Sequence, residues 1–409
     1  ESVDLQLRVA VAAHTRHFGR RPPGVWLPEC AYRPRYEWTP PAGPLRGRRR
    51  FHRLGLEEHL AAFALEFFVT DVHLARGGAP LSAYRDYYPA LRALSEAPQP
   101  GLPGDRSPYC PYRVASRGGR GEAVAFVRDP ATTMQVWSRD AGYPGDPWYL
   151  EFHKKHFPGG LRYWRVTSPR SDLGAKEPYV PARAAERVRA HAEHFVGLLR
   201  EVLSGAAAHL RTPVVACSPY DTELFGHWWF EGPRWLEEVF TRLPDSGIMP
   251  VDCATFLADH PPAETLALQE GSWGEGGDHR VWLNRDTEWT WERLYGVEEE
   301  FWSAAREAAG RDGAATRVLA QAARELLLLQ ASDWQFLITT WAARDYAEAR
   351  FTTHYTNLTR LLPVLRRALA GTPPSSADEE FLRSCETQNF VFPDVARHVQ
   401  AALERVGGA

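Results

Sequence analysis

The sequence predicts an α/β fold in which a parallel sheet is followed by an α-helical domain. Over residues 1 to about 260, short apolar runs typical of buried strands alternate with segments of helical periodicity. Such alternation favours a parallel sheet, either open or closed into a barrel. From about residue 290 the helical periodicity continues without strand signals. At 409 residues the chain is long enough for two or three domains.

The chain is expected to begin with a helix and to continue into a first strand. Leu5 and Val9 recur at helical spacing up to Gly19, a suitable C-cap, and the apolar run 24–27 predicts the strand. The elements expected next are a helix near 57–65 and strands at 66–71 and 123–127. The stretch 96–122 is rich in Pro, Gly and Arg, which predicts a long loop or a small insertion.

The same alternation continues after this stretch. Ala182–Leu203 is amphipathic and predicts a helix that Gly205 ends. It leads into the apolar run 214–217, a predicted buried strand, and a helix follows from Pro233, a favoured first helical residue. In the C-terminal region, apolar periodicity predicts helices within 318–340 and 345–369.

Charge balance and cysteine usage exclude several classes of protein. The formal net charge is −3 and the pI about 6.6, so the chain carries no basic footprint for nucleic acid or an anionic membrane. The Arg-rich run 46–50 is expected to be a solvated loop. Five scattered cysteines without a Cys-x-x-Cys pair argue against a disulfide framework and predict a cytoplasmic protein. No apolar run reaches the length of a membrane span.

Two carboxylates stand out by their surroundings. Glu29 follows Trp-Leu-Pro and precedes Tyr32, and Asp221 follows Ser-Pro-Tyr and precedes His227-Trp-Trp. Each comes shortly after a predicted strand, where parallel-sheet proteins place catalytic groups. Apolar surroundings shift carboxyl pKa values, and paired carboxylates perform glycosyl transfer. The residues alone leave open that Glu29 is a surface charge, that Asp221 belongs to a turn or caps a helix, and which of the two would attack.

Other chemistries have weaker support. The sequence has no Gly-rich phosphate loop of the required form and no Gly-x-Ser-x-Gly elbow. His52, His59 and His73 are loosely spaced and are more typical of packing or surface residues than of metal ligands. His153 and His156 have no evident third ligand. We therefore expect a site without metal and without cofactor.

The segments around the two carboxylates resemble glycoside hydrolase family 57, and within it the 1,4-alpha-glucan branching enzymes. The resemblance rests on Trp-Leu-Pro-Glu-Cys-Ala-Tyr-Arg-Pro at 26–34 and on Ser-Pro-Tyr-Asp-Thr-Glu-Leu-Phe-Gly-His-Trp-Trp at 218–229, and it covers nearly the whole chain. It implies that Glu29 is the nucleophile and that Asp221 is the proton donor.

The resemblance extends to residues that would bind a glucan. Further matches lie at 126–130, 135–138, 142–145, 270–284 and 332–334. They imply four glucan-contacting residues, Arg128, Gly145, Trp273 and Asp333, and two tryptophans that stack on sugar rings, Trp137 and Trp282. Tyr84 resembles a tyrosine on a loop that closes over the site.

For the fold, the resemblance implies an incomplete (β/α)7 barrel over residues 1–260. Within it we expect a small helical insertion near 35–62 and a mobile loop near 80–121. An α-helical domain over 261–409 would contribute to the active-site cleft. The family opens with a His-containing barrel strand that is lacking here, so we expect a segment before Glu1.

The expected function is that of a 1,4-alpha-glucan branching enzyme in glycogen biosynthesis. Such an enzyme cleaves an α-1,4 linkage and transfers the chain to a 6-hydroxyl by a retaining double displacement, with amylose or glycogen as donor and acceptor. We expect a monomer with no nucleic-acid or membrane partner. The alternatives are an alpha-amylase or 4-alpha-glucanotransferase of the same family, and a non-catalytic glucan-binding protein.

Overall fold

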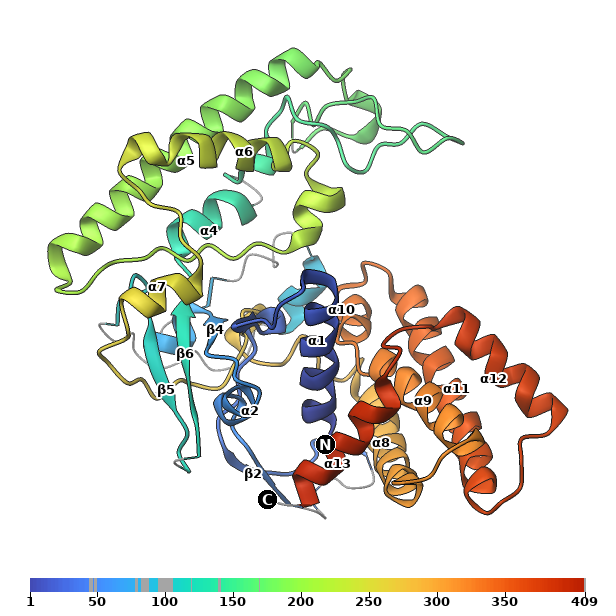
Figure 1. Ribbon diagram of the computed structural model, residues 1–409. Coiled ribbons are helices and arrows are strands. Elements are labelled where there is room, and N and C mark those ends of the chain that lie inside the picture. Colours follow the sequence, from blue (N-terminus) through green and yellow to red (C-terminus); the bar gives the residue numbers. More distant parts are fainter. Residues whose placement is uncertain are drawn as a thin grey trace.

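In the computed structural model the chain forms a sheet region followed by a helical region (Figure 1). The structure describes residues 1–43, 47, 50–77, 80–81, 88–94, 106–118, 120–138, 141–168 and 170–407. The helices after residue 288 gather on one side of Figure 1, and the N-terminal helix lies between them and the sheet. The domain boundary near residue 260 stays a prediction.

Parallel strands form the centre of the sheet region. The sheet has the order β1 (Gly24–Trp26), β4 (Phe67–Thr70), β6 (Glu122–Val127) and β5 (Tyr112–Ala115). β1, β4 and β6 are parallel, with Trp26 opposite Val69 and Val69 opposite Phe126, whereas β5 is antiparallel to β6. The predicted strands 24–27, 66–71 and 123–127 are therefore confirmed. Their carboxyl ends meet at one edge, which is where polar side chains can converge.

Two predictions near this sheet need correction. The expected strand 214–217 makes a single parallel bridge, between Arg128 and Cys217, because the Val215 N–H donates to Tyr109 O (2.9 Å) rather than to β6. Part of the expected loop near 80–121 is instead strand β5, since Tyr112 and Val114 are buried against β6.

Several helices belong to the sheet region of the chain. They are α1 (Ser2–Phe18), α2 (Leu56–Ala62), α3 (Val72–Arg76), α4 (Pro130–Trp137), α5 (Pro181–His209), α6 (Gly232–Arg242) and α7 (Cys253–Asp259). α1 ends as predicted at Gly19, whose φ of 71° is left-handed. Gly205 does not end α5, because glycine can adopt helical dihedrals at a cost of about 1 kcal/mol relative to alanine. The helix ends only at His209, and the next residue, Leu210, is extended and lies three residues before Pro213.

The stretch 35–62, expected to hold a small helical insertion, contains strands as well as a helix. β2 (Tyr36–Trp38) and β3 (Phe51–Arg53) form an antiparallel pair, with Glu37 opposite His52, and α2 follows. Trp38 packs at a steep angle on Tyr295, with ring centroids 5.6 Å apart. The hairpin therefore contacts the helical region of the chain.

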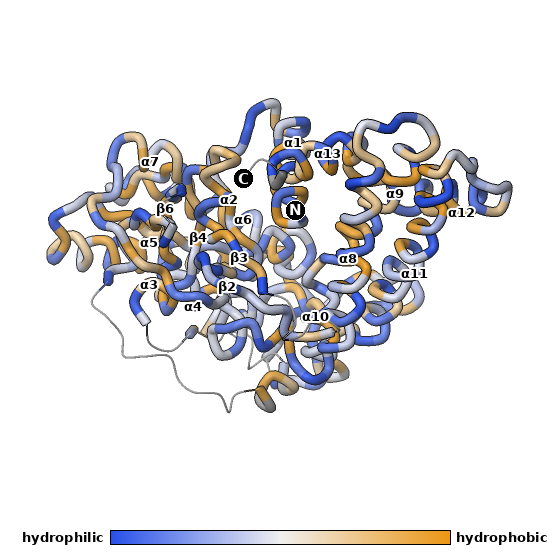
Figure 2. Tube along the Cα trace, turned by 90° about the horizontal axis from the view of Figure 1, so that it is seen from below, coloured by the Kyte–Doolittle hydropathy of each residue, from blue (hydrophilic) through white to orange (hydrophobic). Residues whose placement is uncertain are grey.

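The C-terminal region is helical, as predicted. Its helices are α8 (Glu288–Ala308), α9 (Ala314–Leu329), α10 (Asp333–Thr340), α11 (Arg344–Leu369), α12 (Ser376–Gln388) and α13 (Val395–Gly407). The periodicity over 318–340 belongs to two helices. Residues 330–332 are not helical, and α10 begins at Asp333. Figure 2 shows apolar residues along α9, which packs on α8 and α11. Among the described residues, no helix is long and apolar enough to cross a membrane.

α1 joins the two regions through its buried face. Leu5 and Val9 belong to the core of the helical region, whereas Val11 belongs to the core under the sheet. The Trp302 indole N–H also donates to Ser2 Oγ at 2.9 Å. One amphipathic helix thus fixes the helical region against the sheet, and side chains from both regions can share a cleft.

Truncation of Leu5 tests this junction. Leu5 is 0% exposed, so Leu5→Ala is expected to lower the free energy of unfolding by about 3 kcal/mol, because it removes buried surface and leaves a cavity. Phe18→Ala is the control, since Phe18 lies on the same helix but is 70% exposed. Urea denaturation measures both variants, and equal effects would contradict the proposed role of the buried face.

Candidate active site

A strained turn carries Glu29. β1 ends at Trp26, and a 3-10 turn over Pro28–Cys30 follows immediately. Glu29 has φ 59° and ψ 22°, and Cys30 has φ 50°. Such left-handed dihedrals cost a non-glycine residue about 1–2 kcal/mol, so the surroundings must hold the turn in place.

Two sets of contacts hold this turn. The Trp273 backbone N–H donates to Glu29 O at 2.8 Å, and Tyr32 and Gly271 exchange backbone hydrogen bonds of 2.9 and 3.1 Å. Tyr32 is itself buried, and its hydroxyl donates to Glu57 at 2.8 Å. The segment 271–273 therefore lies along the turn and fixes the direction of the Glu29 side chain.

The Glu29 carboxyl group lies in a buried, acidic environment. Burial raises its pKa to about 7, and the nearby carboxylates of Asp221, Asp333 and Glu223 contribute to the increase. The Trp273 indole N–H donates to Glu29 Oε2 and opposes this increase. Because these charges act on Glu29 from distant parts of the chain, the structure brings the predicted Glu29, Asp221 and Asp333 into one site.

Asp221 occupies the matching place at the same edge of the sheet. It follows the Cys217 bridge to β6, and the Tyr220 hydroxyl anchors this segment by donating to Thr132 O at 3.0 Å. Burial is the main cause that raises the pKa of Asp221 to about 6; Glu223 contributes to this increase and Arg128 opposes it. Two carboxyl groups with raised pKa values therefore meet where the parallel strands end.

A buried ion pair lies beneath these carboxyl groups. Arg128 follows β6 and donates from Nε and Nη2 to the two Asp71 carboxylate oxygens at 3.0 and 2.9 Å. Their side chains are 3% and 0% exposed. Burial by itself would raise the pKa of Asp71, but Arg128 and His73 keep that pKa below its ordinary value. Arg128 therefore stays paired while it also acts on Asp221.

Trp273 links this ion pair to Glu29. The Arg128 guanidinium lies 4.9 Å from the Trp273 ring, and Trp26 and Trp137 meet the same ring at steep angles, with centroids 5.1 and 6.4 Å away. Trp273 is only 3% exposed. In this arrangement its first role is to position Glu29.

The structure places the remaining predicted residues as follows. Trp282 is buried, and its ring packs so tightly on Gly274 that a Cβ there would lie 2.8 Å away. Asp333 begins α10 and is exposed. Gly145 ends a 3-10 turn over Tyr143–Gly145, and Tyr84 lies outside the described residues. Glucan contacts by these residues, and stacking by Trp137 and Trp282, stay predictions.

Sequence reasoning missed several neighbours of the site. Glu223 acts on both Glu29 and Asp221, and its position two residues after Asp221 was the available signal. Asp71 follows β4 directly, as Glu29 and Asp221 follow their own strand segments. His73, expected to pack, is buried with Nε2 3.2 Å from Gly277 O. Among the described residues, no cluster of His, Cys, Asp and Glu could hold a metal ion.

This pair of carboxyl groups on a parallel sheet agrees with the comparisons to known proteins. The chain belongs to glycosyl hydrolase family 57, whose model matches residues 1–269. Residues 293–399 match a second model, described as the C-terminal part of 1,4-alpha-glucan branching enzyme.

Similar proteins carry related names. A 1,4-alpha-glucan branching enzyme of Thermococcus kodakarensis is 41% identical over 369 residues, which are 90% of this chain and 51% of that protein. A probable 1,4-alpha-glucan branching enzyme of Mycobacterium tuberculosis is 30% identical over 361 residues, 86% of this chain and 58% of that protein. The chain thus spans about half the length of the curated relatives it matches.

Solved structures share the fold. The crystal structure of the Thermococcus kodakaraensis family 57 branching enzyme, in complex with glucose and additives, has a TM-score of 0.83 at 39% identity, covering 96% of this chain and 67% of that one. The alpha-amylase AmyC of Thermotoga maritima has a TM-score of 0.72 at 27% identity, covering 98% and 69%. The predicted fold class, an α/β fold with a helical C-terminal region, is confirmed, and the family 57 fold neighbours are consistent with a (β/α)7 barrel.

Replacement of Trp273 tests how it tunes Glu29. Trp273→Phe is expected to raise the pKa of Glu29 by about one unit, because it removes a hydrogen bond to the ionised form worth roughly 1.5 kcal/mol. A carbon-13 NMR titration of the Glu29 carboxyl, identified by its loss in Glu29→Gln, measures the shift. Trp26→Phe is the control, since the Trp26 indole donates to Cys30 Sγ (3.2 Å) instead. An unchanged pKa in Trp273→Phe would refute this role.

Proposed function

We propose that this chain carries the active site of a 1,4-alpha-glucan branching enzyme. The observation that carries the proposal is the pair Glu29 and Asp221, two half-buried carboxyl groups with raised pKa values at the carboxyl edge of a parallel sheet. The names of the relatives support α-glucan as the substrate class. A role in glycogen biosynthesis and a monomeric state belong to the same proposal. All five cysteines lie in described residues and are free, which supports a cytoplasmic location.

The proposed reaction proceeds in two displacements. In the first, the ionised Glu29 attacks the anomeric carbon, the α-1,4 C–O bond breaks, and Asp221 gives its proton to the leaving oxygen. In the second, Asp221 takes the proton of an acceptor 6-hydroxyl, whose oxygen attacks the same carbon and releases Glu29. Two inversions leave the α configuration unchanged and form an α-1,6 branch.

The surrounding residues support these steps. Trp273 donates to Glu29, and its N–H stabilises the carboxylate when this group attacks and again when it leaves. The positive charge of Arg128 acts on Asp221 while Arg128 stays paired with Asp71. Asp333 lies on the helical region and would accept hydrogen bonds from glucan hydroxyls. Exclusion of water from the glycosyl-enzyme by a loop that carries Tyr84 stays an expectation.

The two pKa values constrain the protonation of the pair. Burial raises the pKa of Glu29 to about 7 and that of Asp221 to about 6, so the pair keeps a proton near neutral pH. The proposed reaction needs this proton on Asp221 and an ionised Glu29.

Substitution of the two carboxyl groups tests the proposal. Glu29→Gln and Asp221→Asn are each expected to lower the rate of branching of amylose at least about a thousandfold, because nucleophile and proton donor act as a unit. New α-1,6 linkages measure branching, and Glu193→Gln on the exposed side of α5 is the matched control. Near-normal branching by either variant would refute the assignment.

Rescue of activity by azide distinguishes the nucleophile from the proton donor. With an aryl α-maltoside as substrate, azide should restore turnover of Asp221→Ala and give a glycosyl azide of retained configuration. With Glu29→Ala, azide replaces the nucleophile itself and should give the inverted product. The reverse pattern would exchange the roles of the two residues.

The pH dependence of branching follows from the same pair. Activity is expected to fall below about pH 6, where both carboxyl groups are protonated and no nucleophile remains. It should fall again above about pH 7, where the last proton leaves and no acid remains. Initial rates between pH 4 and 9, a range of roughly two units beyond these values on each side, measure the profile. A plateau that continues to the alkaline end would contradict the proton-donor role.

The similarity to an alpha-amylase favours hydrolysis as a second candidate function. The two reactions differ only in whether water or a sugar hydroxyl attacks the glycosyl-enzyme. Reducing ends counted against new α-1,6 linkages in one reaction mixture separate them. A non-catalytic glucan-binding protein would produce neither, and Glu29→Gln would leave its affinity for amylose unchanged.

A further inference from the structure

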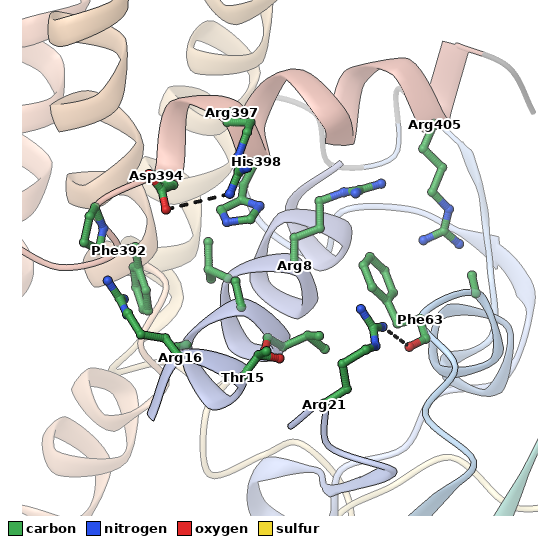
Figure 3. Close-up of a pocket in the computed structure, with 16 residues that line it drawn as sticks. Arg8, Thr15, Arg16, Arg21, Phe63, Phe392, Asp394, Arg397, His398 and Arg405 are labelled. Carbon is green, nitrogen blue, oxygen red and sulfur yellow. Dashed lines mark hydrogen bonds and ion pairs between the residues drawn. The ribbon is translucent and has the colours of Figure 1, made fainter. Parts of the chain in front are cut away.

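A cationic pocket lies between the first and last helices, apart from the carboxyl pair. Among the described residues, α1, α13 and the segments 62–63 and 392–394 line a cavity of about 700 Å³, hereafter the α1–α13 pocket (Figure 3). Five arginines belong to its lining: Arg8, Arg16, Arg21, Arg397 and Arg405. The volume lies within the range of small-molecule sites, roughly 300–1,000 Å³, and exceeds what a single phosphate ion fills.

One pair of these arginines is already engaged. Arg8 and Arg405 both contact the buried carboxylate of Asp4, and their guanidinium groups lie 5.3 and 5.0 Å from the Phe63 ring. Phe63 thus lies close to both cations and to Asp4. This cluster forms a fixed wall of the pocket.

The other three arginines have donors available for a ligand. Arg21 donates from Nη2 to Phe63 O at 2.9 Å, which leaves its remaining N–H groups. Arg397 is 75% exposed and lies 3.7 Å from Asp394, a solvent-exposed pair that contributes little energy. Figure 3 shows Arg16 extending from α1 toward Phe392. With five arginines against Asp4 and Asp394, the described charges of the pocket and its wall sum to +3.

Two further features characterise this pocket. Burial lowers the pKa of His398, a lining residue, and Arg397 and Arg8 lower it further although Asp394 opposes them. Phe392 has a left-handed φ of 50°, and the nearly buried Arg324 holds its segment by donating to Val391 O at 2.7 Å. A strained backbone that its neighbours hold in place is typical of ligand sites.

We propose that the α1–α13 pocket binds a small molecule that carries two phosphate groups. Guanidinium groups bind phosphate oxygens in pairs. In Figure 3, Arg16 extends toward Phe392 and Arg21 toward Phe63, while Arg397 lies on α13. Because these arginines line different parts of the pocket, a ligand with two phosphates can contact more of them than a ligand with one. A neutral glucan offers no counter-charge for this lining. The proposal does not depend on the branching reaction, since none of the three arginines belongs to the carboxyl site.

Calorimetric titration of the full chain with pyrophosphate tests the proposal. Saturable binding at one site is expected, and Arg16→Ala combined with Arg397→Ala should weaken it at least about tenfold, because two charge-assisted contacts are lost. Arg189→Ala is the matched control, since it removes one exposed arginine on α5, far along the chain from the pocket. This variant should bind pyrophosphate like the parent chain.

Three results would overturn the proposal. They are the lack of saturable binding, an equal loss of affinity in Arg189→Ala, and inorganic phosphate that binds as tightly as pyrophosphate. Circular dichroism checks that each variant is folded. If the double variant is not, Arg397→Gln alone replaces it, because this side chain is mostly in solvent, and its affinity must then fall while that of Arg189→Ala does not.

Discussion

The contact between Trp273 and the Glu29 turn is the interaction on which the rest of the site depends. It joins residues 244 positions apart through a backbone hydrogen bond to Glu29 O and an indole hydrogen bond to the carboxylate. Without the segment 271–273, the left-handed turn would have no backbone partner on that side. The same tryptophan meets Arg128, Trp26 and Trp137, so one side chain couples the position of Glu29 to the buried ion pair.

The partial burial of the site's carboxyl groups affects how they are charged. The carboxylates of Asp221, Glu223 and Asp333 act on Glu29, and Glu223 also acts on Asp221. Burial and mutual repulsion together keep a proton within the group. Arg128 opposes the increase in the pKa of Asp221. The Asp71 carboxylate, which is hydrogen-bonded to Arg128, partly balances the positive charge of Arg128. The helical region contributes through Asp333, which explains why α1 must fix it against the sheet.

Much of the fold could be predicted because the signals are local. β1, β4 and β6 are short apolar runs, and α1 and α5 have apolar residues at helical spacing. β5 could not be predicted, because its four residues lie among Pro-, Gly- and Arg-rich neighbours. The run 214–217 does not form a strand ladder with β6, because the Val215 N–H donates to Tyr109 O instead. These outcomes depend on tertiary partners that no local pattern reports.

In the candidate site, too, some features could be predicted from the sequence and others could not. Glu29 and Asp221 were predicted because both follow strand-like segments, and the structure brings them together. The pairing of Asp71 with Arg128 could not be predicted, because each residue lies beyond a different strand and nothing in either segment names its partner. Likewise, the buried, hydrogen-bonding role of Trp273 follows from its position between two regions of the chain.

The left-handed backbone at Glu29 has a consequence for how this protein can vary. Glycine adopts such dihedrals freely, so a chain selected only for thermal endurance would replace this glutamate with glycine and gain about 1 kcal/mol. Under the proposed function, the residue that carries this backbone strain is also the nucleophile. A screen that rewards heat resistance alone would then favour a substitution that removes the proposed activity.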